Sequence, residues 1–202
     1  VERLLCLYGE YVREIVLVAQ ADDLERIEEL RARSGALAKV SAVVAGGAAR
    51  SDSVRRGVAA ASRACELVAV HDAARALVER RTIEAALALA GREGAALVAV
   101  PVRDTLKRSA DGRRAAETVA REGLFSAQTP QVFRADRFRD LLERAEREGF
   151  APTDDAALWE RWIGPVPIAP GEVENLKITT PADLVLAAAI LEARAAVAGG
   201  RR

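Results

Sequence analysis

The polar residues best suited to bind a phosphorylated ligand follow short apolar segments of this sequence. One such segment is followed by the run HDAAR at residues 71–75, and another by Gly46–Gly47. Aspartate can face a metal ion that carries phosphates, arginine binds phosphate oxygens, and glycines before a helix let the backbone approach an anion. The pattern indicates a nucleotide or phosphate site, although Gly-Gly before a helix is also an ordinary structural connection.

Two later segments add hydroxyl groups and a cation. Asn175–Pro181 (NLKITTP) places one lysine and two threonines before an expected helix, a combination that can bind an oxyanion. Thr153–Ala156 (TDDA) also precedes an expected helix, where helix capping is the ordinary explanation. His71 is the single histidine of the chain, and no Ser or Cys nucleophile motif accompanies it. We therefore do not expect His71 to be a catalytic base.

Composition excludes several classes of protein. The chain has 202 residues, 50% of them hydrophobic, which is enough for one domain with a sizeable core. Thirty basic and thirty acidic residues give no net charge, so we expect neither a nucleic-acid partner nor a polybasic membrane contact. The apolar runs are too short to cross a bilayer, and Cys6 and Cys65 lack the spacing of a zinc site. We expect a cytoplasmic protein.

Strand and helix patterns alternate in the first half of the chain. Apolar and β-branched runs predict strands at Arg13–Ala19, Lys39–Ala45, Leu67–Val70 and Ala95–Val102. Helices are expected between them, at Asp22–Leu30, after a cap at Ser51 or Asp52, and at Arg80–Leu89. This alternation predicts an α/β fold with a mostly parallel sheet and helices on both faces.

The alternation is interrupted by a predicted β-hairpin arm at about residues 103–121. Thr105–Ser109 and Ala116–Ala120 flank Asp111-Gly112, a pair that favours a tight turn. A two-stranded hairpin is marginal alone, so we expect a second copy of the chain to cover it. A strand at Gly123–Ala127, a polar QTPQ loop, two helices, a short strand at Val166–Ile168 and a helix from Pro181 follow, all within one domain, 1–202.

Seven sequence blocks in order resemble a known family. They are GGxxRxxSVxxG at 46–57, HDAAR at 71–75, PVxDTLK at 101–107, TVxR at 118–121, QTPQxF at 128–133, TDDA at 153–156 and NxKITTPxDL at 175–184. Together they resemble the 2-C-methyl-D-erythritol 4-phosphate cytidylyltransferase family, which uses CTP in the non-mevalonate isoprenoid route. The resemblance covers essentially the whole chain and implies a Rossmann-like nucleotidyltransferase fold.

The resemblance also implies a role for individual residues. The implied nucleotide-binding residues are Gly47, Ala48, Ser53 and Asp72, with Asp72 also near a Mg²⁺ ion. The implied residues of the methylerythritol phosphate pocket are Asp72, Arg75, Thr105, Thr129, Thr153 and Thr179. Arg121 and Lys177 are the implied catalytic residues, which position the attacking phosphate. In the family the arm reaches across a homodimer, so Thr105 and Arg121 would serve the neighbouring subunit's site.

The chain departs from the family at its start and at two single positions. Family members begin with a strand and a glycine-rich loop that cradles the triphosphate, and no such loop is found here. Since methionine is absent even at position 1, we expect residues to precede Val1. Ala48 and Ala76 replace an acid and a proline. The alternatives are a ribitol-5-phosphate cytidylyltransferase and a catalytically silent nucleotide-binding dimer.

Overall fold

The computed structural model describes residues 2–33 and 38–199, and a four-stranded sheet lies at its centre. In this sheet β3 (Leu67–Val70) and β4 (Ala95–Pro101) flank β7 (Phe125–Arg134), and β8 (Ile168–Pro170) lies beyond β4. β8 is parallel to β4, whereas β7 is antiparallel to both of its neighbours. The strand order confirms an α/β sheet in which β3, β4 and β8 share one direction and β7 opposes them.

Helices cover both faces of this sheet because successive side chains of each strand point to opposite sides. Ala96 and Val132 pack with Ala86 and Ala90 of α4 (Arg80–Glu93). The neighbouring residues Ala95 and Phe133 belong to the core on the other face, formed with α5 (Ala135–Glu148) and α6 (Ala156–Trp162). On that face Phe133 stacks on Phe138 with ring centroids 4.4 Å apart.

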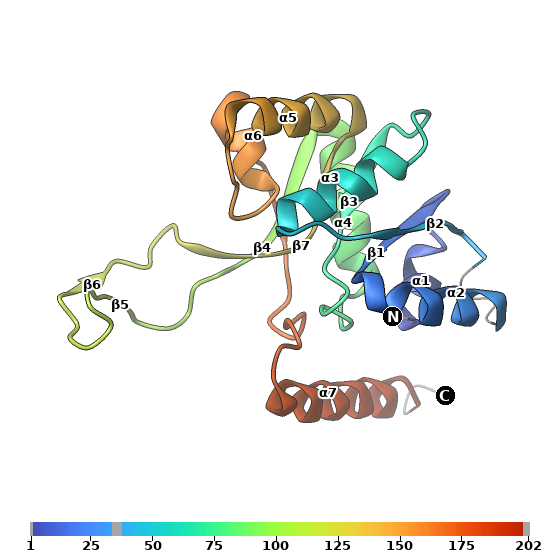
Figure 1. The fold of residues 1–202 in the computed structure, drawn as a ribbon. Helices are drawn as coiled ribbons and strands as arrows, with labels where there is room; N and C mark the ends of the chain where they lie inside the picture. The colour runs from blue at the N-terminus through green and yellow to red at the C-terminus, as the bar shows by residue number, and fades with distance from the viewer. Residues whose placement is uncertain (1, 34–37, 200–202) are drawn as a thin grey trace.

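The N-terminal part of the chain forms a second, smaller sheet (Figure 1). Here β1 (Ile15–Ala19) pairs in parallel with β2 (Val40–Ala45), as their apolar sequences predict. Three helices lie around this pair: α1 (Glu2–Tyr8), α2 (Leu24–Arg33) after a 3₁₀ turn at Ala21–Asp23, and α3 (Arg50–Ala60). Within the described residues no backbone pairing joins β1 to β3. The cap of α3 differs from expectation: Ala49 is the N-cap, and Asp52 accepts its N–H at 3.2 Å.

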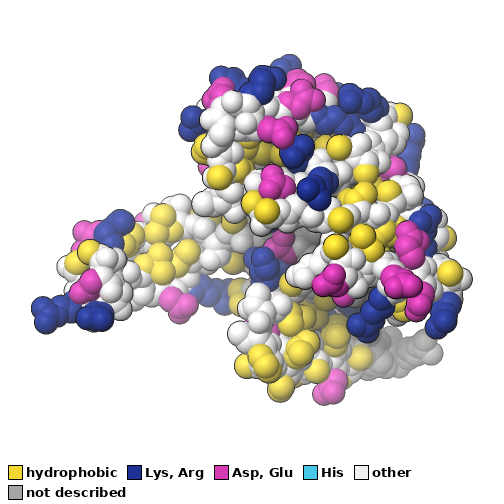
Figure 2. All heavy atoms as spheres, viewed as in Figure 1, with side chains coloured by type: hydrophobic (Ala, Val, Ile, Leu, Met, Phe, Trp, Pro, Cys, Tyr) yellow, Lys and Arg dark blue, Asp and Glu magenta, His cyan; other side chains and the backbone are white. Residues whose placement is uncertain are grey.

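The arm projects away from the rest of the molecule (Figure 1), and Figure 2 shows basic side chains gathered at its tip. Its strands β5 (Leu106–Arg108) and β6 (Glu117–Val119) are antiparallel, as expected. The tight turn at Asp111-Gly112 was a wrong prediction, because residues 109–116 form a wider loop. The Asp111 carboxylate holds this loop by accepting the N–H groups of Arg113 and Arg114 at 2.8 and 3.0 Å.

Two further expectations need correction. The QTPQ segment is not a loop, because β7 continues through it to Arg134 and buries most of its side chains. The short strand expected at Val166–Ile168 is β8, which begins at Ile168. The last helix begins at Pro181 as predicted and forms α7 (Pro181–Gly199), which exposes the side chains of Leu184, Val185 and Leu186. Among the described residues no helix is long and apolar enough to span a membrane.

Candidate functional site

The site is centred on Asp72, the second residue after β3. Its carboxylate Oδ2 lies 2.9 Å from Nζ of Lys177, which comes from the loop between β8 and α7. Its Oδ1 lies 3.7 Å from Nη2 of Arg50, the first residue of α3. Burial raises the pKa of the Asp72 carboxyl, but Lys177 and the nearby arginines outweigh burial and hold this pKa below its usual value. The group is therefore an anion held among cations.

Arg75 joins the Asp72 loop to the loop that carries Lys177. Its Nη1 donates to the backbone carbonyl of Asn175 at 2.8 Å and its Nη2 to that of Ala127 at 3.3 Å. Its Nε is buried without a hydrogen-bond partner among the described residues. Burial lowers the pKa of the guanidinium, which nevertheless stays charged. Arg75 thus brings a positive charge to the same sheet end as Lys177.

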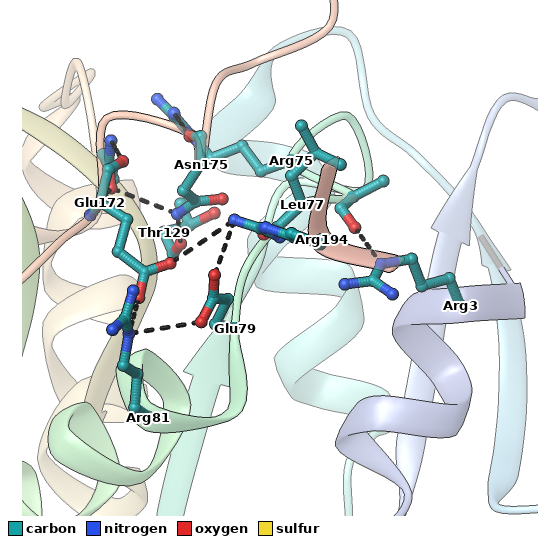
Figure 3. A network of polar contacts seen from close by, with 11 residues as sticks. Arg3, Arg75, Leu77, Glu79, Arg81, Thr129, Glu172, Asn175 and Arg194 are labelled. Atoms are coloured by element: carbon teal, nitrogen blue, oxygen red, sulfur yellow. Dashed lines mark hydrogen bonds and ion pairs between the residues drawn. The ribbon is translucent and has the colours of Figure 1, made fainter. Parts of the chain in front are cut away.

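Asn175 fixes the start of the Lys177 loop against β7 (Figure 3). It is completely buried, and its Nδ2 donates to Oε1 of Gln128 at 3.2 Å and to the carbonyl of Thr129 at 3.1 Å. Gln128 in turn donates to the carbonyl of Glu172 at 2.8 Å. Behind this loop, Arg194 of α7 pairs with Glu79 at 2.9 Å. Neither amide was identified from the sequence, although a polar QTPQ block after an apolar strand was a usable signal.

Arg50 and Asp155 form a second pair that sequence reasoning missed. Nη2 of Arg50 lies 2.7 Å from Oδ2 of Asp155, whose side chain is 2% exposed. Burial raises the pKa of Asp155, and Arg50 opposes this increase. Since a buried carboxylate needs a cationic partner, the acids of TDDA were a signal for a distant arginine. Through this pair Arg50 ties α3 to the start of α6 and to Asp72.

Hydrogen bonds within the glycine loop, residues 46–53, hold its conformation. The N–H of Gly47 donates to Oγ of Ser53 at 3.0 Å, and Ser53 donates to the carbonyl of Ala49 at 3.2 Å. A Cβ at Gly47 would lie 2.1 Å from Cβ of Asp52, so only glycine fits there. The loop, together with His71 and Asp72, lines a cavity of about 1410 Å³ that β1 and β3 also line.

His71 and Thr129 lie directly behind Asp72. Oγ1 of Thr129 accepts the N–H of Asp72 at 3.0 Å and lies 3.2 Å from Nδ1 of His71. Burial of His71 lowers the pKa of its imidazole to about 4, so the ring is neutral near pH 7. The neutral, enclosed ring supports the site structurally through these contacts, and that His71 is not a catalytic base stays a prediction.

The other predicted site residues lie outside this cluster. Thr153 is exposed before α6, and Thr179 donates through both its N–H and its hydroxyl to Asp183 in the first turn of α7. Thr105 and Arg121 lie at the base of the arm, where Arg121 donates to the carbonyl of Arg103. Within the described part of the chain no hydrogen bond or ion pair joins either arm residue to Asp72 or Lys177.

Few side chains near Asp72 could bind the predicted Mg²⁺ ion. No cluster of three or more His, Cys, Asp or Glu side chains in residues 2–33 and 38–199 could hold an ion. Mg²⁺, however, commonly binds through one or two carboxylates plus substrate phosphates and water. Asp72 alone fits that mode of binding, with its side chain 19% exposed.

Comparisons with known proteins agree with this architecture. The profile of the family described as 2-C-methyl-D-erythritol 4-phosphate cytidylyltransferase (IspD) matches residues 4–193. The cytidylyltransferase of that name from Alkaliphilus oremlandii is 39% identical over 91% of this chain and 78% of its own length. The one from Solibacter usitatus is 40% identical over 92% and 77%.

Solved structures give the same result. The crystal structure of 2-C-methyl-D-erythritol 4-phosphate cytidylyltransferase from Thermus thermophilus superposes with a TM-score of 0.78 at 34% identity, covering 93% of this chain and 86% of that one. The 4-diphosphocytidyl-2C-methyl-D-erythritol synthase from Anaerococcus prevotii gives a TM-score of 0.82 at 26% identity over 95% and 89%.

The depressed pKa of His71 predicts a pH dependence of folding stability. Well above pH 6.5 the imidazole is neutral in both the folded and the unfolded chain. As the pH falls toward 4, the unfolded chain binds a proton that the folded chain, with a pKa of about 4, does not. The free energy of unfolding should therefore fall by up to about 3 kcal/mol across this window.

Urea unfolding at pH 7 and pH 4.5, in metal-free buffer, measures this effect. Asp72 and Arg75 are the charged groups that act on the ring, and both are kept in a His71→Gln variant. The variant should lose less stability than the parent on acidification, because His71 is the only histidine. Equal losses in both proteins would show that His71 does not cause the dependence.

Proposed function

This chain belongs to the 2-C-methyl-D-erythritol 4-phosphate cytidylyltransferase family, and we propose that the residues described above carry out the reaction of that family. The chain is a nucleotidyltransferase of isoprenoid biosynthesis that converts CTP and 2-C-methyl-D-erythritol 4-phosphate to 4-diphosphocytidyl-2-C-methyl-D-erythritol and pyrophosphate. The observation that supports the residue assignment best is the Asp72–Lys177 pair at 2.9 Å, with Arg75 on the same loop as Asp72. Lys177 and Arg75 supply positive charge where two polyanions must meet, and Asp72 holds the ammonium of Lys177 in place.

The reaction needs no side-chain nucleophile. An oxygen of the methylerythritol phosphate attacks the α-phosphorus of CTP, a new P–O bond forms, and the bond to pyrophosphate breaks. The protein must hold two anions in line and stabilise the charge that moves to the leaving group. Lys177 is suited to this task because its ammonium has three donors and its ion pair with Asp72 occupies only part of them.

The remaining residues bind and orient the two substrates. The loop of Gly47, Ala48 and Ser53 contacts the cytidine of CTP, and Arg75, Thr129, Thr153 and Thr179 line the methylerythritol phosphate pocket. Asp72 would hold Mg²⁺, which when bound offsets the negative charge of the triphosphate. Arg50 keeps Asp72 in place between α3 and β3.

Assembly and location complete the proposal. The arm extends away from the body of its own chain (Figure 1), and Leu124 and Phe125 at its base are 37% and 44% exposed. Docking against a second copy would cover this apolar surface, so the enzyme is a homodimer whose exchanged arms bring Thr105 and Arg121 to the partner's site. We infer a cytoplasmic enzyme without a nucleic-acid partner, and the net charge of zero supports the second of these two inferences.

The first prediction concerns the substrate. Protein expressed from the complete gene should release pyrophosphate from CTP and 2-C-methyl-D-erythritol 4-phosphate in the presence of Mg²⁺, measured with a coupled pyrophosphate assay. Ribitol 5-phosphate serves as the competing acceptor. A preference for ribitol 5-phosphate of more than about tenfold in kcat/KM would overturn the acceptor assignment and leave the cytidylyl transfer intact.

The second prediction concerns Lys177. A cation that orients an attacking phosphate contributes on the order of 3 kcal/mol to the transition state, so Lys177→Ala should lower kcat/KM by roughly 10²-fold. The matched control is Lys39→Ala, since Lys39 binds backbone carbonyls near the N-terminus, among them that of Val12 at 2.9 Å. A near-normal rate for Lys177→Ala would place this lysine outside the reaction.

The third prediction concerns the shared site. Arg121→Ala and Lys177→Ala subunits should each be inactive alone. In a mixed dimer with exchanged arms, both substitutions fall in one of the two sites, and the other site has both wild-type residues. Subunit exchange should therefore restore up to about half of the wild-type activity per mixed dimer. If no activity returns after exchange is verified by mass spectrometry, Arg121 and Lys177 act within one subunit.

A further inference from the structure

His71 offers one hydrogen-bond acceptor to two hydroxyl groups. Its Nε2 lies 3.2 Å from the carbonyl oxygen of Arg75, and because a carbonyl only accepts, Nε2 carries the ring proton. In the neutral ring Nδ1 then has a single lone pair. Oη of Tyr8 lies 2.9 Å from this nitrogen and Oγ1 of Thr129 lies 3.2 Å from it. The two hydroxyls therefore compete for one acceptor.

Tyr8 is the better placed of the two donors. Its side chain comes from α1, is 8% exposed, and packs on His71 with ring centroids 5.1 Å apart. Its hydroxyl lies closer to Nδ1 than that of Thr129 does. When Tyr8 donates to Nδ1, Thr129 cannot, and the Thr129 oxygen already accepts the N–H of Asp72 at 3.0 Å. The hydroxyl proton of Thr129 is then left without an acceptor in this network.

We propose that Tyr8 is a positioning residue: by occupying Nδ1 of His71 it leaves the Thr129 hydroxyl proton free to bind an oxygen of the phosphorylated acceptor substrate. This inference rests on the proposed function, in which Thr129 lines the acceptor pocket. The Asp72 amide fixes the Thr129 oxygen, and Tyr8 decides where its proton points. Tyr8, which lies in α1 and 63 positions before His71, thus acts on the substrate indirectly, through His71 and Thr129.

Removing the Tyr8 hydroxyl should change the direction in which the Thr129 hydroxyl proton points. In Tyr8→Phe the lone pair of Nδ1 becomes available, and the Thr129 hydroxyl turns toward His71 and away from the substrate. The loss of one neutral hydrogen bond to the substrate should raise KM for 2-C-methyl-D-erythritol 4-phosphate about fivefold. The KM for CTP and kcat should stay within about twofold, which a general loss of structure would not produce.

Tyr11→Phe is the matched control. Tyr11 lies three residues further on and donates its hydroxyl to Oε1 of Glu84 at 2.7 Å, away from His71. The change removes the same atom from the same region of the chain, and all kinetic constants should remain at wild-type values. Thermal unfolding of both variants and of the wild-type protein verifies that the variants are folded at the assay temperature.

A double-mutant cycle with Thr129 tests the proposed route. Thr129→Val should raise KM for the acceptor, Thr129→Ser should preserve it, and Tyr8→Phe should add no further change in the Thr129→Val background. An added effect there would overturn the inference, because Tyr8 would then act independently of Thr129. If Tyr8→Phe has no effect while Thr129→Val does, the inference fails and the proposed function stands. If Thr129→Val has no effect either, the assignment of Thr129 to the acceptor pocket fails, and the inference with it.

Discussion

The arrangement of the site depends on three polar side chains that β7 buries in the middle of the sheet. Gln128, Thr129 and Gln131 are 6%, 4% and 2% exposed, and a buried polar group without a partner costs about 1–3 kcal/mol. Each one finds its partner on a different segment. Gln128 binds Asn175, Thr129 binds the amide of Asp72, and Gln131 accepts the N–H of Ala156 at 2.8 Å. The hydrogen bonds of these three β7 side chains therefore fix three loops relative to one another.

Those loops carry opposite charges that compensate one another before any substrate arrives. Asp72 and Asp155 are anions inside a set of cations formed by Arg50, Arg75 and Lys177. Each buried carboxylate lowers the cost of keeping a guanidinium or ammonium group in a partly dry environment. The cations are consequently held in defined places, and a phosphate that enters can take over donors that the carboxylates leave free.

The sequence predicts the parts of this structure that depend on local pattern. Apolar runs located β1 to β4, and the resemblance to the family implied that Asp72 and Lys177 share one pocket, which agrees with their ion pair. Contacts between distant residues were not predictable. The Arg50–Asp155 pair spans 105 positions. The QTPQ part of β7 was predicted as a loop because three of its four side chains are polar. Only the fold shows that each of them has a partner.

The central position of β7 has a consequence for how the molecule exchanges hydrogen with solvent. β7 pairs along one edge with β3 and along the other with β4, and its side chains from Gln128 to Phe133 are buried. Its amide hydrogens should therefore be among the last to be replaced by deuterium, because their exchange requires the sheet to open. The short strands of the arm, β5 and β6, are largely exposed, so their amide hydrogens report only local opening, whereas those of β7 report the unfolding of the whole sheet.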